Sequence, residues 1–173
     1  VEDDKDVIHY IAVYNENYPM PAKPTSVDEG IVKGLYMLRG APKGDGPIVR
    51  LIGSGPIMIQ VLDAVEKLEE FGVRSEIWSA TSYGELRRDG LEVDRWNRLN
   101  PDKEPKQTWT QTQLGNSKTP IIAVSDNMAA VPDMVRKWMP DNFEVLGTDG
   151  FGRSDTREAV SYTHLTLPTM ELV

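Results

Sequence analysis

The densest group of residues that could do chemistry is GTDGFGRSDTR at residues 147–157. It follows a run that predicts a strand, and open α/β sheets place their sites at the carboxyl ends of strands. Its arginines suit bidentate binding of a carboxylate or phosphate. Two interpretations stay open, a docking loop or active-site rim and a loop that pairs with itself against a neighbouring domain. The residues assigned to this interface or docking loop are Asp149, Phe151, Arg153, Ser154, Asp155 and Arg157.

The glycine triplet Gly53-Ser54-Gly55 resembles a phosphate-binding turn. It stands between an apolar run and a helical pattern, where backbone N–H groups can hold an anion. It lacks the third glycine of GxGxxG, and Ser79 and Ala80 stand where an acidic residue that binds a ribose would follow the next strand. We therefore predict that these glycines serve a tight turn.

A second triplet, Gly44-Asp45-Gly46, has the form that holds Mg²⁺ on the diphosphate of thiamine diphosphate enzymes. In those enzymes an Asn roughly 25–30 residues later completes the ligand set, since hard oxygen ligands suit this ion. No Asn lies in that window, because the next one is Asn97. The triplet also precedes its predicted strand, so we interpret it as a turn.

Few other residues could carry catalysis. The chain has no Cys and only two His, His9 in a predicted strand and His164 near the end. Thiolate chemistry is therefore excluded, and a metal triad or a Ser-His-Asp site has little to build on. Glu66, Glu69 and Glu70 fit a solvated helix face, so we predict no catalytic, cofactor-binding or metal-ligating residue. Core packing is favoured over a role as interface anchors for most of Trp78, Trp96, Trp109 and Trp138.

The composition is that of one globular domain. Apolar residues make up 39% and charged residues 27%, which excludes collagen-like and wholly disordered classes. The 27 acidic and 19 basic residues give a net charge of −8, which argues against nucleic-acid and anionic-membrane partners because those need a basic surface. No apolar run approaches the ~20 residues of a membrane span. The acidic start VEDDKD has no signal-peptide pattern.

Alternating apolar runs and helical patterns predict an α/β fold, a three-layer open sheet with mostly parallel strands. The clearest unit is IVRLIG, a helical run from Pro56 to Gly72, and RSEIWSA. Such a βαβ unit is almost always a right-handed parallel crossover. Three prolines at residues 19–24 exclude a regular helix or strand and predict an ordered crossing or a linker. The predicted strands are residues 8–14, 35–38, 48–53, 74–80, 119–126 and 142–150.

The remaining helices are predicted between these strands. Residues 82–100 show a helical pattern broken near Gly90, and residues 128–140 a second one. Residues 101–118 are polar and predict a loop, with one helical turn around Trp109. A helical turn is also predicted over residues 28–34, and Ser154 would cap a last helix. The side chains predicted to face inward from residues 82–100 are Leu86, Val93, Trp96 and Leu99.

The last residues do not continue the α/β pattern. The segment SYTHLTLPTMELV is strand-like and interrupted by Pro168, where the fold requires a helix after Ser154. We interpret residues 160–173 as a non-native read-through tail of translated vector or adapter sequence, with a genuine extended tail as the alternative. The chain also begins without Met, which favours a start inside a longer gene.

Three long segments carry a family resemblance. They are NENYPMP (15–21), EIWSATSYGELRRDGLEVDRWNRLNP (76–101) and VLGTDGFGRSDTRE (145–158). They resemble the C-terminal part of the homodimeric pyruvate dehydrogenase decarboxylating components, the thiamine diphosphate-dependent first enzymes of the bacterial 2-oxo acid dehydrogenase complex. The resemblance covers nearly all of residues 1–159, but only the last portion of a much longer family chain.

The resemblance implies a division of the chain and a role for it. Residues 1–27 would be the end of the middle, pyrimidine-binding domain and its linker, and residues 28–159 an incomplete transketolase-like C-terminal domain. The parent would decarboxylate pyruvate oxidatively and pass the acetyl unit to a lipoyl group, with thiamine diphosphate and Mg²⁺ held upstream of residue 1. The implied partners are a second copy of the subunit and the lipoyl acyltransferase component, in the bacterial cytoplasm. This piece would be an inactive scaffold, dimer and docking domain.

Two other interpretations stay open. The chain would be a free-standing, non-catalytic α/β module that binds a partner or a small anion if it is not a piece of a longer protein. It would be the C-terminal domain of a transketolase if the shared fold were the whole of the resemblance. The segment DGLEVDRWNRLNP favours the dehydrogenase component over transketolase.

Overall fold

A five-stranded sheet with the order β1-β3-β2-β4-β5 forms the centre of the protein. The structure is a computed structural model that describes residues 17–115 and 117–148. Strands β3, β2, β4 and β5 run parallel, and β1 pairs antiparallel with β3 at one edge. This confirms the mostly parallel α/β sheet; the strand predicted over residues 8–14 lies outside the described residues. The strands are β1 (Leu35–Arg39), β2 (Ile48–Gly53), β3 (Arg74–Ala80), β4 (Ile121–Met128) and β5 (Phe143–Thr148).

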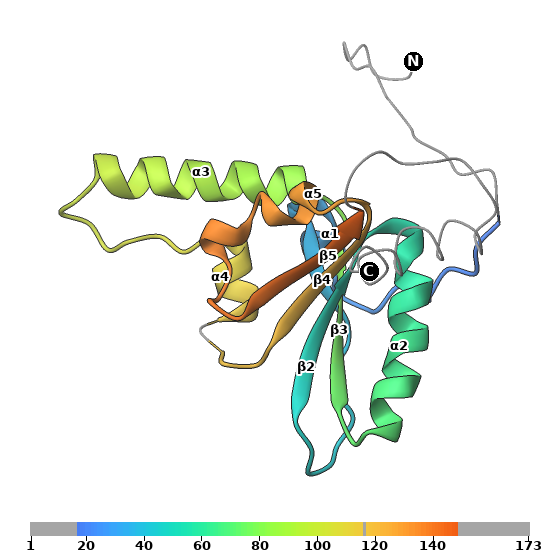
Figure 1. Ribbon diagram of the computed structural model, residues 1–173. Helices are drawn as coiled ribbons and strands as arrows, with labels where there is room; N and C mark the ends of the chain where they lie inside the picture. The colour runs from blue at the N-terminus through green and yellow to red at the C-terminus, as the bar shows by residue number, and fades with distance from the viewer. Residues whose placement is uncertain (1–16, 116, 149–173) are drawn as a thin grey trace, which may run out of the picture.

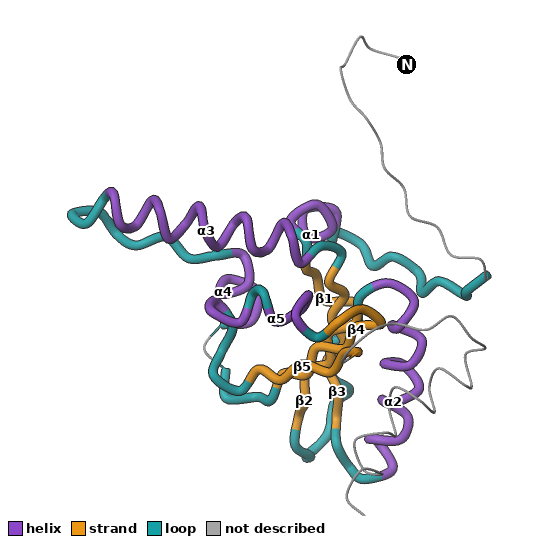
Figure 2. Tube along the Cα trace, turned by 45° about the horizontal axis from the view of Figure 1, so that its top comes forward, coloured by secondary structure: helices purple, strands orange, loops and turns teal. Residues whose placement is uncertain are grey.

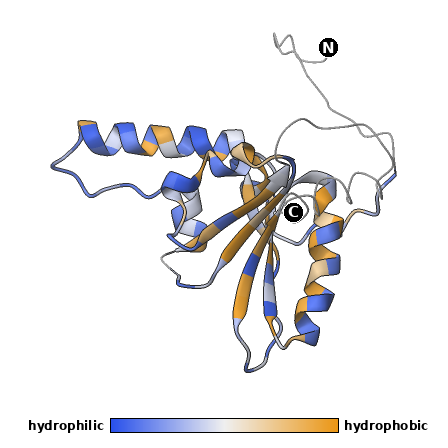
Figure 3. Ribbon diagram, viewed as in Figure 1, coloured by the Kyte–Doolittle hydropathy of each residue, from blue (hydrophilic) through white to orange (hydrophobic). Residues whose placement is uncertain are grey.

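Helices cover both faces of this sheet and make three layers. Figure 1 shows α2 on one face and α3, α4 and α5 on the other. The helices are α1 (Asp28–Lys33), α2 (Met58–Glu70), α3 (Tyr83–Leu99), α4 (Trp109–Leu114) and α5 (Ala130–Asp133), with two short 3-10 turns, η1 (Gly55–Ile57) and η2 (Arg136–Trp138). Figure 3 shows the apolar residues concentrated in the strands and on one side of α2.

The alternation of side chains along each strand builds two separate cores. Successive strand residues point to opposite faces. In β2, Leu51 packs toward α2 while Ile52 joins the core under α3 and α4. In β3, Ile77 and Trp78 divide in the same way. Helix α2 closes the smaller core with side chains that include Val65.

The predicted helix after Pro56 is confirmed, with its start and end. The 3-10 turn η1 places Pro56 in the first turn before α2 begins, where its missing N–H costs nothing. The helix ends at Glu70, and Gly72 takes a φ of 72°, a backbone conformation that favours glycine.

The break predicted near Gly90 is wrong, because α3 runs unbroken over Tyr83–Leu99. Ser82 caps its start, with its Oγ accepting a hydrogen bond from the Glu85 N–H at 3.1 Å. A Cβ at Gly90 would lie 2.4 Å from Cδ2 of Trp138. The glycine therefore admits the indole ring and does not interrupt the helix. The inward prediction holds for Leu86 and fails for Leu99, which is 66% exposed.

The single helix predicted over residues 128–140 is also wrong. Strand β4 extends to Met128, and only the short elements α5 and η2 follow. The Trp138 N–H bonds to the carbonyl of Val135 at 3.0 Å, a 3-10 contact that tightens the chain. This tighter path carries Trp138 into the gap at Gly90.

The polar stretch before β4 contains one short helix, as predicted around Trp109. A capping box at the start of α4 joins Thr108 and Gln111, each accepting a hydrogen bond from the other's backbone N–H. Residues 17–24 form neither helix nor strand, as the prolines predict, and the linker itself stays a prediction. Among the helices in the described part of the chain, we find none with the length and apolar character that crossing a membrane requires.

Candidate functional site

The described residues reach only the base of the predicted docking loop. Strand β5 ends at Thr148. Among the described residues β5 is the last strand of the sheet and pairs with β4, so the chain enters the predicted loop from the carboxyl end of this strand. The six residues assigned to it lie outside the described residues and stay a prediction: Asp149, Phe151, Arg153, Ser154, Asp155 and Arg157.

The base of this loop packs tightly at the carboxyl edge of the sheet. A Cβ at Gly147 would lie 2.7 Å from the backbone N and Cα of Ala129. The Ala129 N–H donates to the carbonyl of Thr148 at 3.4 Å. The Asn127 N–H donates to Ser125 Oγ at 3.1 Å within β4, where the pairing with β5 is irregular between Val124 and Met128. Glycine at 147 therefore lets the last residues of β5 lie against the backbone of Ala129.

A polar hollow of about 570 Å³ lies between α3, the loop after it and α4. Asn97, on α3, joins this helix to the loop. Its Nδ2 donates to the Lys106 carbonyl at 3.0 Å, and its Oδ1 accepts from the Lys106 N–H at 2.8 Å. Thr108 and Gln111 are occupied by the capping box. These polar groups already have partners within the protein, so the hollow holds no set of free catalytic groups among them.

The one carboxylate of this hollow with a shifted pKa is Asp94. A hydrogen bond from Lys137 lowers the pKa of Asp94 below its ordinary value. Asp94 is therefore ionised at neutral pH and is unsuited to donate a proton there. Its role in the described structure is to join α3 to η2.

A partly buried ion pair fixes α4 to the sheet. Arg50 Nε lies 2.6 Å from Glu76 Oε2, and the two side chains are 14% and 19% exposed. Arg50 Nη1 also donates to the carbonyl of Leu114 at 2.7 Å. Arg50 and Glu76 therefore join β2, β3 and α4.

The Tyr83 hydroxyl is buried and has no hydrogen-bond partner among the described residues. Burial raises the pKa of this phenol, so the hydroxyl stays neutral.

The glycine triplets are turns, as predicted. Gly46 accepts two hydrogen bonds on its carbonyl from Arg74, at 3.1 and 2.7 Å, and a Cβ there would lie 2.3 Å from the Gly72 carbonyl oxygen. At the other triplet, Gly55 takes a φ of 66°. A Cβ at Gly53 would lie 3.0 Å from Cε of Met58. Close packing at a strand–helix junction accounts for this second triplet.

The residues described here do not fit a diphosphate-bound Mg²⁺. Asp45 lies exposed in the turn that Arg74 closes, away from any set of hard oxygen ligands. No group of three or more His, Cys, Asp or Glu that could hold a metal occurs in residues 17–115 and 117–148. The predicted solvated face of α2 is confirmed, because Glu66, Glu69 and Glu70 are all exposed. His9 lies outside the described residues.

The tryptophans are mainly core residues. Trp78 and Trp138 are buried in the core under α3, and Trp109 packs against it. The indole N–H of Trp109 donates to the carbonyl of Leu35 at 2.9 Å, which ties α4 to β1. Trp96 is half-buried on α3, with Lys106 Nζ 4.4 Å from its ring centroid. Sequence periodicity placed these residues on helices and strands but could not pair Trp138 with Gly90.

Comparison with known proteins places this sheet and its helices in a family. Residues 34–166 match the family of transketolase-like TK C-terminal domains. The chain belongs to this family. Among curated relatives of this transketolase-like chain, the pyruvate dehydrogenase E1 component of Pseudomonas aeruginosa is 46% identical over 160 residues, and that of Escherichia coli is 43% identical over 159 residues. The recognised resemblance is therefore confirmed.

The transketolase-like chain covers only part of these relatives. Each of the two alignments spans 91% of this chain but 18% of the relative. A solved structure of a histidine-to-phenylalanine variant of transketolase from Pichia stipitis aligns with a TM-score of 0.54 and 19% identity, over 86% of this chain and 18% of that one. At this identity the structural match shows the fold alone.

Proposed function

We propose that this transketolase-like domain is a piece of a pyruvate dehydrogenase E1 component, the enzyme that decarboxylates pyruvate and passes the acetyl unit to a lipoyl group. The observation that carries the proposal is the 46% identity to an E1 component over 91% of this chain. The features of the described residues support a structural role for this piece in the enzyme. Several of their polar and ionisable groups join elements of the fold, as the Arg50–Glu76 pair does, and they include no cluster of three or more acidic or His residues that could hold the Mg²⁺.

We propose that this domain supports the rest of the enzyme subunit and contacts its partners. Thiamine diphosphate with its Mg²⁺ supplies the decarboxylation chemistry in the parent and would be held by residues outside this chain. Residues 28–159 would form the incomplete C-terminal domain, residues 1–27 the end of the preceding domain with its linker, and residues 160–173 a non-native tail. The loop at residues 149–157, based on the edge strand β5, would contact the second subunit or the lipoyl acyltransferase. The parent would act in the bacterial cytoplasm.

The proposal is tested by sequencing the source DNA through both ends of this reading frame. We expect the frame to continue upstream into a segment with Gly-Asp-Gly and a following Asn, and past Ala159 into a basic and aromatic helix. The longer polypeptide should release CO₂ from pyruvate when thiamine diphosphate and Mg²⁺ are added. A start codon directly before Val1 and a genomic origin of the final SYTHLTLPT segment would overturn the proposal and favour a free-standing binding module.

Calorimetry on the 173-residue chain gives a second test. We expect no saturable heat when thiamine diphosphate is added with Mg²⁺, because the proposal places the residues that hold both outside this chain. Tight binding that requires Mg²⁺ would place the cofactor site in this chain and contradict the proposed division of labour.

A further inference from the structure

Helix α3 and the loop after it form an arm that projects from the sheet. Figure 2 shows this arm, residues 83–108, extending beyond the layers that α2, α4 and α5 make with the strands. Only its base is packed into the core, through Tyr83, Leu86 and Gly90. The rest of α3 is therefore available on its outer side.

The arm is held in shape by its own contacts. Asn97 donates to the carbonyl of Lys106 and accepts a hydrogen bond from its N–H. Asp89 accepts a hydrogen bond from the Trp109 N–H at 2.6 Å, and Asn100 donates to the Trp96 carbonyl at 2.8 Å. A projection that is organised before any partner binds loses little conformational entropy on binding. These contacts hold the arm in one conformation, so that it offers an ordered surface to a partner.

The outer side of α3 separates charges sharply. With about 100° per residue, seven exposed residues fall within an arc of roughly 120°, which is the width of a helix face that packs on a partner. Four are arginines and two are leucines. None is acidic, and Glu92 and Asp94 lie just beyond the two edges of the arc. These residues, called the outer face from here on, are Gly84, Arg87, Arg88, Leu91, Arg95, Arg98 and Leu99.

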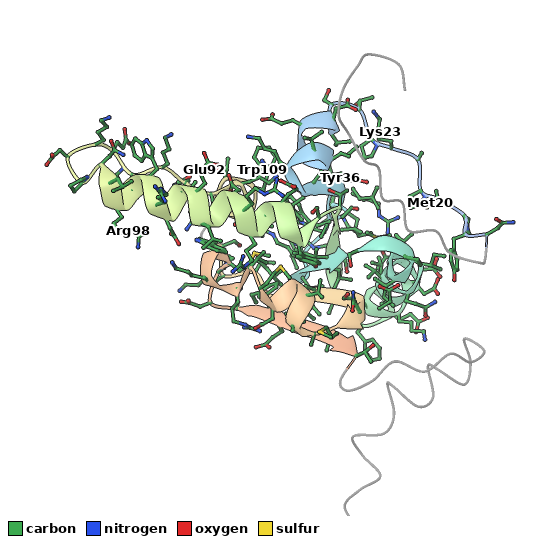
Figure 4. The ribbon with its side chains drawn as sticks, turned by 90° about the horizontal axis from the view of Figure 1, so that it is seen from above. Met20, Lys23, Tyr36, Glu92, Arg98 and Trp109 are labelled. Carbon is green, nitrogen blue, oxygen red and sulfur yellow. The ribbon has the colours of Figure 1, made fainter. Side chains whose placement is uncertain are left out.

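Three of the four acidic residues of α3 have partners within the protein, and one of these partners is Arg88 of the outer face. Glu85 lies 2.9 Å from Arg88, Asp89 accepts from the α4 backbone, and Asp94 accepts from Lys137. Figure 4 shows Arg98 and Glu92 on opposite sides of α3. The outer face is thus basic in a chain whose net charge is −8. Its two leucines are 45% (Leu91) and 66% (Leu99) exposed.

We propose that the outer face docks an acidic polypeptide that carries apolar side chains. Guanidinium groups bind carboxylates bidentately, and the leucines between them need an apolar counterpart, which a nucleic-acid backbone does not offer. Complementary charge would steer the two surfaces together, and the leucines would fix the fit. This surface shares no residue with the predicted docking loop, and its proposal does not depend on the parent's activity.

The test uses the full 173-residue chain and two synthetic helical peptides of about 20 residues. One peptide alternates glutamates with leucines on one side, and the other has serine in place of each leucine. Binding is followed by amide chemical shifts of the ¹⁵N-labelled chain. We expect the Glu/Leu peptide to shift α3 amides over residues 87–99 and to bind about tenfold more tightly than the Glu/Ser peptide.

Two matched triple variants decide whether the outer face is the binding surface. Arg87→Glu, Arg95→Glu and Arg98→Glu together should weaken Glu/Leu binding at least about tenfold, while Lys43→Glu, Lys67→Glu and Lys118→Glu together should weaken it less than about twofold. Both sets change the net charge equally, and circular dichroism checks that each variant is folded. Equal weakening by the two sets would overturn the proposal, because it would show a general charge effect.

Two further experiments test the leucines and the alternative that the outer face binds a nucleic acid. Leu91→Ser with Leu99→Ser should reduce the affinity for the Glu/Leu peptide to that for the Glu/Ser peptide. No change in this variant would overturn the apolar part of the proposal. A single-stranded oligonucleotide of about 20 nucleotides is titrated in parallel. Tighter binding of the oligonucleotide than of the Glu/Leu peptide would also overturn the proposal and make the face a nucleic-acid contact.

Discussion

The sheet and the arm are stabilised in different ways. Strands β1 to β5 are joined by side chains that are fully removed from water, among them Leu35, Ile52, Ile121 and Phe143, each 0% exposed. The outer half of the arm is held by hydrogen bonds and by lysines over the Trp96 ring. Buried apolar area stabilises a whole domain cooperatively, whereas exposed polar contacts act locally. Changes in the sheet should therefore alter the free energy of global unfolding. Changes in the outer half of the arm should alter only its local opening.

The largest expected effect tests the sheet. Phe143→Ala on β5 removes a ring that is wholly buried in the core under α3, and we expect the free energy of unfolding to fall by about 3–5 kcal/mol. Urea unfolding of the 173-residue chain measures it. Phe71→Ala is the matched control, because that ring is 81% exposed after α2. If both variants lost similar stability, the distinction between core and surface drawn here would be wrong.

The next effect lies where the arm meets the sheet. Gly90→Ala would press a methyl group against the Trp138 ring, 2.4 Å from Cδ2, and we expect a loss of about 1–3 kcal/mol from overpacking. Gly84→Ala on the same helix meets nothing closer than Ser82 Oγ at 3.7 Å. We expect it to stabilise the protein by about 0.5 kcal/mol, because alanine restricts the unfolded chain.

We expect the two glycine substitutions to change the free energy of unfolding in opposite directions. Thermal unfolding of both variants beside the parent chain measures them. A stabilising Gly90→Ala would show that Trp138 moves away at little cost and that the arm is only loosely attached to the sheet.

Gly90 also shows where sequence interpretation stops. The strands at residues 48–53 and 74–80 and the helix between them are visible locally, as apolar runs bounded by glycine and proline. A glycine inside a helical pattern favours a break by propensity alone. Its actual role depends on Trp138, 48 residues later in the chain, and no local pattern contains that contact. Trp138 in turn lies in the short element η2, where the sequence pattern predicts one helix over residues 128–140.

The candidate site was predictable only in part. The sequence places the segment at residues 147–157 after a strand, and the structure confirms the strand up to Thr148. The six residues assigned to the loop stay a prediction. The outer face was missed, because Leu99 fits an inward position by periodicity alone. The charge pattern of α3 was a usable signal, since its arginines fall on one side of a helical wheel and its acids on the other sides.

A smaller effect tests the outer half of the arm. Asn97→Ala removes both hydrogen bonds to the Lys106 backbone, and we expect the hydrogen-exchange protection of the Lys106 amide to fall about tenfold. The urea midpoint should hardly change, because alanine is the better helix former. Asn97→Asp is the control, since it keeps the acceptor for the Lys106 N–H. A global loss of stability in Asn97→Ala would show that the arm and the sheet unfold as one unit.

The smallest effect concerns the ion pair between α3 and η2. Lys137 lowers the pKa of Asp94 in the folded protein, so the folded state holds the carboxylate more strongly than the unfolded chain does. The pair's stabilisation is therefore complete above the unfolded value near 3.8 and is lost as the pH falls through the lowered folded value. We expect Asp94→Asn to cost less than about 1 kcal/mol at pH 7, since Asp94 is partly exposed.

That cost should shrink to zero under acid conditions, when the parent chain has lost the same charge. Urea unfolding at several pH values measures the difference between Asp94→Asn and the parent chain. Asp63→Asn, on the exposed side of α2, is the control and should follow the parent chain throughout. A cost for Asp94→Asn that is independent of pH would mean that the side chain acts through shape or hydrogen bonding. The arm would then be attached to η2 by packing, as the strands are to one another, and the contrast between the two regions would be weaker than the contacts indicate.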